Sequence, residues 1–190
     1  MTGRAIAILR GRDDRYLIPA ARVLLDAGLP LELPLTTPGA LAAIEALGGR
    51  VGAGTVLTRD AAADAVSAGA SFLVTPAMVP EVIAYGNDHG VPVYAGALTP
   101  TEVWDAHRAG APFIKIFPAS SVGPEYVAAL RQPFPELRYV PVGGIGLDQA
   151  PAYLAAGAVA VGVGSPLVGD ALTTGDLDGL RDRARLWAAL

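Results

Sequence analysis

The residue with the clearest chemical potential is Lys115, the single lysine of the chain, which lies in the apolar stretch PFIKIFPAS (112–120). Side chains alternate along a strand, so Lys115 shares one face with Phe113 and Phe117, while Ile114 and Ile116 take the other. We expect the isoleucines to face covering helices, which directs the lysine inward. Burial would lower the pKa of this amine, and a neutral amine attacks carbonyl carbon to form a Schiff base. The alternative is a structural lysine that pairs with a carboxylate or extends its amine to solvent.

A carboxylate, an arginine and a threonine occupy similar positions on other apolar runs. Glu32 alternates with leucines in LELPLTT (31–37), so it too should point inward, where a carboxylate either pairs with a cation or moves protons. Arg10 ends the first apolar run and either pairs with Glu32 or binds a substrate carboxylate through both guanidinium nitrogens. Thr55, in GAGTVL (52–57), either donates to a carboxylate or is an ordinary turn residue.

Elements that would position these side chains follow from a repeat of glycine-centred turns. The first five of these glycines are separated by 21, 20, 21 and 20 residues, and the last interval of 47 leaves room for two units. Each follows a helix-like segment, such as YLIPAARVLLDAG (16–28), and precedes a short apolar run. This is the position where a helix end needs a left-handed residue. The glycines are Gly28, Gly49, Gly69, Gly90, Gly110 and Gly157.

Eight short apolar runs alternate with these helix-like segments, which predicts a parallel sheet. The runs are 5–9, 31–35, 50–54, 72–75, 91–95, 113–117, 139–143 and 158–162. Eight regular units favour an α/β fold in which one domain, residues 1–190, forms a single (β/α)8 TIM barrel. A doubly wound sheet is the alternative. Polar and glycine-rich residues follow the runs, and barrel chemistry sits at that end of the strands.

Two glycine loops, VGGIG (142–146) and VGVGSPL (161–167), follow the seventh and eighth runs. In barrels of this type the corresponding loops commonly bind phosphate through backbone N–H groups. The candidates are Gly143, Gly144, Gly164 and Ser165; the alternative is ordinary tight turning.

Composition excludes several classes of function. A net charge of −4 gives no electrostatic support to a nucleic-acid or membrane partner, and no cysteine and only two histidines leave no evident metal site. The N-terminus lacks the pattern of a signal peptide. An uncharged stretch at 149–169 is interrupted by glycines and prolines, so we expect a cytoplasmic protein with no membrane span.

The motifs together resemble the 2-keto-3-deoxy-6-phosphogluconate aldolase superfamily of class I aldolases, in the family's order and over nearly the whole chain. They are IAILRG (6–11), LELPLTTP (31–38), VGAGTVL (51–57), FLVTP (72–76), IKIFPAS (114–120), PVGGI (141–145) and VGVGSPLV (161–168). Within it, the chain looks more like the galactonate-type enzymes. Gluconate-type members typically carry an arginine where Thr36 stands and a threonine where Val142 stands, whereas Arg10 fits the galactonate pattern.

The resemblance implies a role for each candidate residue. Lys115 would form a carbinolamine and then an iminium ion with a phosphorylated 2-keto acid. Glu32, through a water, would move protons, while Arg10 and Thr55 would hold the carboxylate. Gly143, Gly144, Gly164 and Ser165 would hold the phosphate. The products would be pyruvate and glyceraldehyde 3-phosphate, with no metal or organic cofactor, and the assembly a homotrimer.

Three other functions stay open on the sequence. The first is a gluconate-type or 4-hydroxy-2-oxoglutarate aldolase, the latter acting on a substrate without phosphate. The second is a phosphosugar isomerase or epimerase on a similar barrel, which would not need an imine-forming lysine. The third is a non-catalytic barrel that binds a sugar phosphate.

Overall fold

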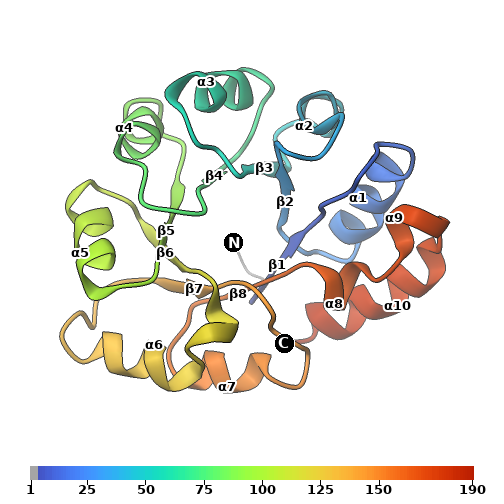
Figure 1. Ribbon diagram of the computed structural model, residues 1–190. Helices are drawn as coiled ribbons and strands as arrows, with labels where there is room; N and C mark the ends of the chain where they lie inside the picture. Colours follow the sequence, from blue (N-terminus) through green and yellow to red (C-terminus); the bar gives the residue numbers. More distant parts are fainter. Residues whose placement is uncertain (1–3) are drawn as a thin grey trace.

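The computed structural model describes residues 4–190 and shows a ring of parallel strands surrounded by helices (Figure 1). The strands are β1 (Ala5–Ile8), β2 (Leu31–Pro34), β3 (Val51–Gly54), β4 (Leu73–Val74), β5 (Val93–Ala97), β6 (Phe113–Ile116), β7 (Tyr139–Pro141) and β8 (Val161–Val163). The helices are α1 (Leu17–Asp26), α2 (Ala40–Leu47), α3 (Arg59–Ser67), α4 (Pro80–Asp88), α5 (Pro100–Arg108), α6 (Pro124–Arg131), α7 (Ala150–Ala155), α8 (Ser165–Val168), α9 (Ala171–Thr174) and α10 (Leu177–Ala188), with a 3-10 turn at Ala119–Ser121.

The strands form a closed barrel. Neighbours pair in parallel in the order β7-β6-β5-β4-β3-β2-β1-β8. Between β7 and β8 the ring closes through a bridge of Val142 with Gly162 and a hydrogen bond of 2.9 Å from the Val159 N–H to the Tyr139 carbonyl. The predicted (β/α)8 barrel is therefore confirmed, and the doubly wound alternative is wrong.

Two predicted strands are displaced along the chain. The fifth was expected at 91–95 and lies at 93–97, because its pairing continues to Ala97 opposite Ile116 of β6. The eighth was expected at 158–162 and lies at 161–163. The preceding residues bond to β7 through Val159, but pairing with β1 begins only at Val161 opposite Ala5. An apolar run predicts extended backbone, and the neighbouring strand decides where the ladder starts.

The glycine repeat marks the ends of helices as predicted. All six glycines have positive φ, between 65° and 98°, as a left-handed helix cap requires. The 47-residue gap has a specific cause: α6 ends at Arg131, and its cap residue Gln132 is right-handed and followed by Pro133 instead of a glycine. Proline cannot continue a helix, so it ends this one without the glycine signal.

The alternation of side chains separates two apolar regions. Leu31, Leu33, Ile114 and Ile116 belong to the large core between strands and helices. The other face of the strands builds a smaller cluster inside the barrel, formed by Ile6, Phe72, Val74, Tyr94, Val140, Val142 and Ala160. A polar residue on the inward face is therefore surrounded by apolar side chains.

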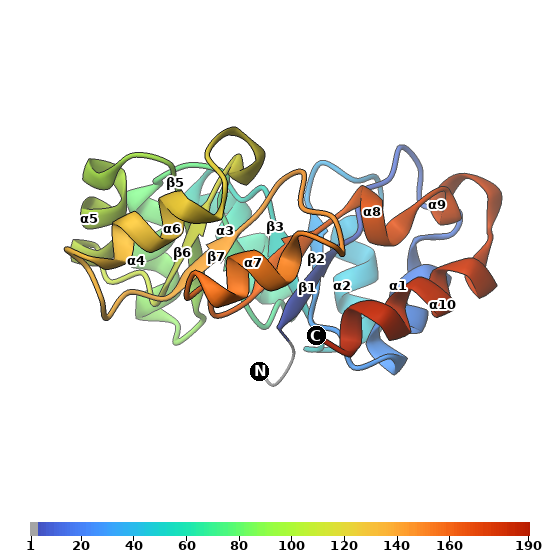
Figure 2. The same ribbon diagram turned by 90° about the horizontal axis from the view of Figure 1, so that it is seen from below.

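The chain continues beyond the eighth strand as α8, α9 and α10. These lie side by side with α1 on the outside of the barrel, and α10 contacts both α1 and α8 (Figure 2). Within residues 4–190, no helix is long and apolar enough to cross a membrane. The same residues contain no group of three or more His, Cys, Asp or Glu side chains that could hold a metal ion.

Candidate active site

Lys115 and Glu32 line the same cavity inside the barrel, although they come from opposite strands, β6 and β2. Lys115 is 6% exposed and Glu32 is 3% exposed. Both line a cavity of about 10 Å³, shared with Ile6, Val74, Tyr94, Val140, Val142 and Gly162. This volume is near the smallest that accommodates one water molecule. The predicted inward orientation of both residues is confirmed.

Burial and mutual attraction set the protonation of this pair. Desolvation lowers the pKa of Lys115, an effect that the Glu32 charge opposes and the Arg10 charge reinforces. Desolvation likewise raises the pKa of Glu32, while the charges of Lys115 and Arg10 pull it down. Burial thus shifts both groups toward their neutral forms, and a neutral amine near a carboxyl can attack a carbonyl and exchange protons.

Glycine at position 54 creates the space for Glu32. A Cβ at Gly54 of β3 would lie 1.9 Å from Oε1 of Glu32, closer than any real contact. Gly54 carries no reactive group, so its contribution was not predicted from the sequence. The sequence pattern around Gly54, small residues that alternate with glycine in VGAG, can be recognised as making space for Glu32 only once the neighbouring strand is known.

Arg10 and Thr55 are brought together at the end of the barrel where the strands terminate. The Nη2 of Arg10 donates to Oγ1 of Thr55 over 3.3 Å. Thr55 has φ of 56°, which a β-branched residue rarely adopts, and such strain tends to gather at functional sites. The exposed Arg10 also influences the pKa values of both buried groups, so its charge acts on the same site.

Phe117 forms an aromatic wall over the amine and was not predicted to belong to the site. The Nζ of Lys115 lies 5.0 Å from the centroid of its ring, within the range of a cation–π interaction. Phe117 is 39% exposed, which is unusual for a large apolar side chain. A ligand on Lys115 would therefore contact an apolar surface on one side.

The loops after β7 and β8 adjoin through the Val142–Gly162 bridge. Gly143 and Gly144 have φ of 102° and 73°, so both need glycine. A Cβ at Gly143 would lie 3.2 Å from the Phe117 ring, and one at Gly144 would lie 2.8 Å from Cβ of Ser120. These glycines therefore also serve packing, and Ser120 is a second hydroxyl beside the loop that sequence analysis did not single out.

Gly164 and Ser165 continue the same edge from β8. Gly164 is half-buried, and a Cβ there would meet nothing closer than the Ile8 carbonyl oxygen at 3.8 Å. Ser165 is exposed. All four predicted phosphate-site residues thus lie at one end of the barrel, in adjacent loops that leave backbone and hydroxyl groups accessible.

An inward amine of lowered pKa, a neighbouring carboxyl and an arginine at the strand ends can together form an imine with a 2-keto acid. A (β/α)8 barrel that carries these three side chains corresponds to the class of imine-forming aldolases. The family model for KDPG and KHG aldolase matches residues 1–182, and the chain belongs to this family of carbon–carbon lyases.

The chain is similar to relatives that carry two different enzyme names. The chain is 40% identical over 159 residues to the 2-dehydro-3-deoxy-phosphogluconate aldolase of Pseudomonas aeruginosa, covering 80% of this chain and 72% of that one. It is 35% identical over 170 residues to the 2-dehydro-3-deoxy-6-phosphogalactonate aldolase of Escherichia coli, covering 85% and 83%. Among solved structures, the KDPG aldolase of Legionella pneumophila, with pyruvate captured as a covalent carbinolamine, superposes with a TM-score of 0.90 at 27% identity over 98% of this chain and 94% of that one.

Proposed function

We propose that this protein is a class I aldolase that cleaves a 2-keto-3-deoxy-6-phospho sugar acid into pyruvate and glyceraldehyde 3-phosphate. The observation that carries the proposal is the position of Lys115, buried inside the barrel with Glu32 and Phe117 around its amine. Neither an isomerase nor a binding protein needs such an amine, and family membership favours the aldolase over both.

In the proposed reaction the Nζ of Lys115 attacks the C2 ketone, giving a carbinolamine that loses water to become an iminium ion. A base removes the proton of the C4 hydroxyl, the C3–C4 bond breaks, and its electron pair moves into the iminium. The aldehyde leaves, and the remaining enamine is protonated at C3 and hydrolysed to pyruvate and free lysine. Glu32, directly or through one water in the small cavity, would carry these protons.

Arg10 and Thr55 would bind the substrate carboxylate. Arginine offers a planar pair of donors that matches a carboxylate, and the Arg10–Thr55 hydrogen bond orients this fork over the site. Gly143, Gly144, Gly164 and Ser165 would bind the phosphate at the far end of the substrate, with Ser120 as a further donor. The known carbinolamine in the Legionella relative supports the same covalent chemistry here.

We favour the galactonate-type substrate over the gluconate type. Thr36 stands where gluconate-type enzymes typically carry an arginine, Arg10 supplies the cation from the loop after β1, and Val142 replaces their threonine. The test is release of pyruvate from the two C4 epimers, each with and without the 6-phosphate. We expect the highest kcat/KM for phosphorylated galactonate; preference for the gluconate epimer would reassign the substrate.

The same assay separates the remaining member of the family. A 4-hydroxy-2-oxoglutarate aldolase would cleave that phosphate-free substrate as well as any phosphorylated one, which would contradict the proposed phosphate site. We also propose a homotrimer, as the family resemblance implies, and a cytoplasmic location, as the sequence composition suggests. Light scattering on the purified protein should then give three times the monomer mass, and a monomer or dimer would refute that assembly.

A further inference from the structure

We propose that Arg183, on the outer helix α10, is a positioning residue that holds the loop after β8 in the shape that binds the substrate phosphate. This inference rests on the proposed function, because it concerns the phosphate loops assigned there. Arg183 lies outside every motif of the family resemblance and touches no residue of the pair Lys115 and Glu32.

The contacts of Arg183 all converge on the end of the segment that starts at Gly164. Its Nε donates to the Leu167 carbonyl over 2.7 Å, and its Nη2 donates to the Val168 carbonyl over 3.0 Å. These are the last two carbonyls of α8, a helix of only four residues. The final carbonyls of a helix have no partners within it, and a helix this short depends on outside donors to satisfy them.

Two glycines leave room for the guanidinium. A Cβ at Gly169, directly after α8, would lie 2.9 Å from Nη2 of Arg183. A Cβ at Gly179 of α10 would meet the Asp176 carboxylate first and then Nη1 of Arg183 at 3.1 Å. Gly169 also has φ of 57°, so the chain turns there in a way that favours glycine. The arginine is therefore built into this turn, with space provided from both sides.

Helix α10, which carries Arg183, is itself held in place by packing. Helix α10 packs along α1 and contacts α8, while Leu167 and Val168 are buried at 0% and 5% exposure. The segment from Gly164 to Val168 is thereby held at both ends. Strand β8 fixes its start, and the hydrogen bonds from Arg183 to the Leu167 and Val168 carbonyls fix its end. Loss of the two hydrogen bonds would free the carbonyl end of this short segment and displace the groups of Gly164 and Ser165 from the positions in which they bind the phosphate.

The consequence should be confined to the phosphate. Lys115 and Glu32 come from β6 and β2, and neither strand pairs with β8, the strand that leads into α8. We therefore expect a weaker grip on the phosphorylated substrate, while imine formation and cleavage of a phosphate-free substrate are unaffected.

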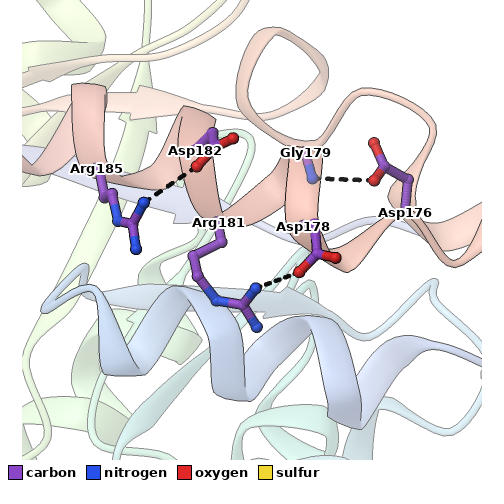
Figure 3. A network of polar contacts seen from close by, with 6 residues as sticks. All are labelled: Asp176, Asp178, Gly179, Arg181, Asp182 and Arg185. Carbon is purple, nitrogen blue, oxygen red and sulfur yellow. Dashed lines mark hydrogen bonds and ion pairs between the residues drawn. The ribbon is translucent and has the colours of Figure 1, made fainter.

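The chain offers matched controls on the same helix. Arg181 pairs with Asp178, and Arg185 pairs with Asp182, both as exposed ion pairs three residues apart (Figure 3). Exposed pairs of this kind contribute little to stability. R181M and R185M therefore remove an arginine from α10 without touching α8, whereas R183M removes the two hydrogen bonds to it.

The experiment measures kcat and KM for the 6-phosphorylated 2-keto-3-deoxy acid and for its phosphate-free form, together with the melting temperature. We expect R183M to raise KM for the phosphorylated substrate about tenfold, with kcat and the phosphate-free reaction changed less than about twofold, since a misplaced binding group costs affinity at its own contact. R181M and R185M should match the parent protein.

A conservative variant protects the test if R183M does not fold. R183K keeps a cation beside the carbonyls but loses the fork that reaches both, so KM for the phosphorylated substrate should rise by roughly threefold. Equal losses on both substrates, a loss of kcat alone, or no change in either variant would overturn the positioning role. If the parent protein shows no preference for the phosphorylated substrate, the proposed phosphate site itself is wrong. The kinetics of the parent protein reveal this before any variant is made.

Discussion

The carboxylate of Glu32 on β2 lies against the α-carbon of Gly54 on β3, so closely that a Cβ at Gly54 would be 1.9 Å from Oε1. The two strands are in direct register, with Pro34 opposite Gly54. The absence of a side chain at Gly54 therefore determines where the carboxylate of Glu32 on the neighbouring strand can lie.

Gly54→Ala should disable the site through Glu32. The new methyl group must displace the carboxylate, so we expect kcat to fall by about 10²-fold or more, as for loss of a general acid or base. The control is a pair of variants in which Glu32 is already truncated. In E32A the space is open, so adding G54A should cost little further activity or stability, and the two changes should be strongly non-additive. Additive losses would show that Gly54 acts independently of Glu32.

Glu32→Gln should shift the pH dependence of imine formation in a defined direction. The Glu32 charge raises the pKa of Lys115, so its removal lowers that pKa further. The neutral amine is then present at lower pH, and the acidic limb of the rate of adduct formation with pyruvate should move to lower pH. Turnover should still fall by about 10²–10⁴-fold because proton transfer is lost. An acidic limb that stays in place or moves to higher pH contradicts the coupling.

Thr55→Gly should stabilise the protein while weakening substrate binding. Thr55 holds a φ of 56°, and such strain costs on the order of 1–3 kcal/mol in a residue other than glycine. After the entropy that glycine loses on folding, we expect the free energy of unfolding to rise by about 1 kcal/mol. Denaturant unfolding of T55G measures this, with T36G at a nearby exposed threonine as the control. Thr36 has no positive φ, so T36G should lose about 0.5–1 kcal/mol of stability through the entropy of glycine alone. A T55G variant as destabilised as T36G would argue against strain at Thr55.

Arg10→Lys should raise KM without changing kcat. Lysine keeps the charge but cannot bind a carboxylate with two parallel hydrogen bonds, so KM should increase about tenfold. Arg12, exposed in the same loop, provides the matched control R12K, which should behave as the parent. If R12K raised KM as much as R10K, the effect would follow from loss of any arginine in this loop and not from loss of the Arg10–Thr55 pairing.

Much of the fold could be predicted because each strand carries its own signal. Apolar runs between glycine-ended helices specified eight units, and the alternation around Lys115 and Glu32 predicted their inward orientation. The starting points of β5 and β8 could not be predicted, since they depend on the neighbouring strand.

The parts of the site that escaped prediction have the same origin. Gly54 and Ser120 act through contacts with residues distant in sequence, Glu32 and Gly144. Phe117 lies two residues from Lys115 on the same strand face, but a phenylalanine there does not by itself indicate a site residue. Arg183 reaches α8 from a helix outside the barrel, which no local pattern of charge could indicate. Reactive residues can be recognised by type and parity, whereas the residues that shape their surroundings require the three-dimensional neighbours.

The most direct test of the central claim is borohydride reduction of the protein in the presence of pyruvate, followed by mass spectrometry of the intact chain and its peptides. The chain's other amine is the N-terminus, so the site of reduction can be assigned with little ambiguity. We predict one pyruvate-derived adduct on Lys115, absent in K115M. Folded protein without an adduct on Lys115, under conditions that trap a known class I aldolase, would contradict the Schiff-base mechanism.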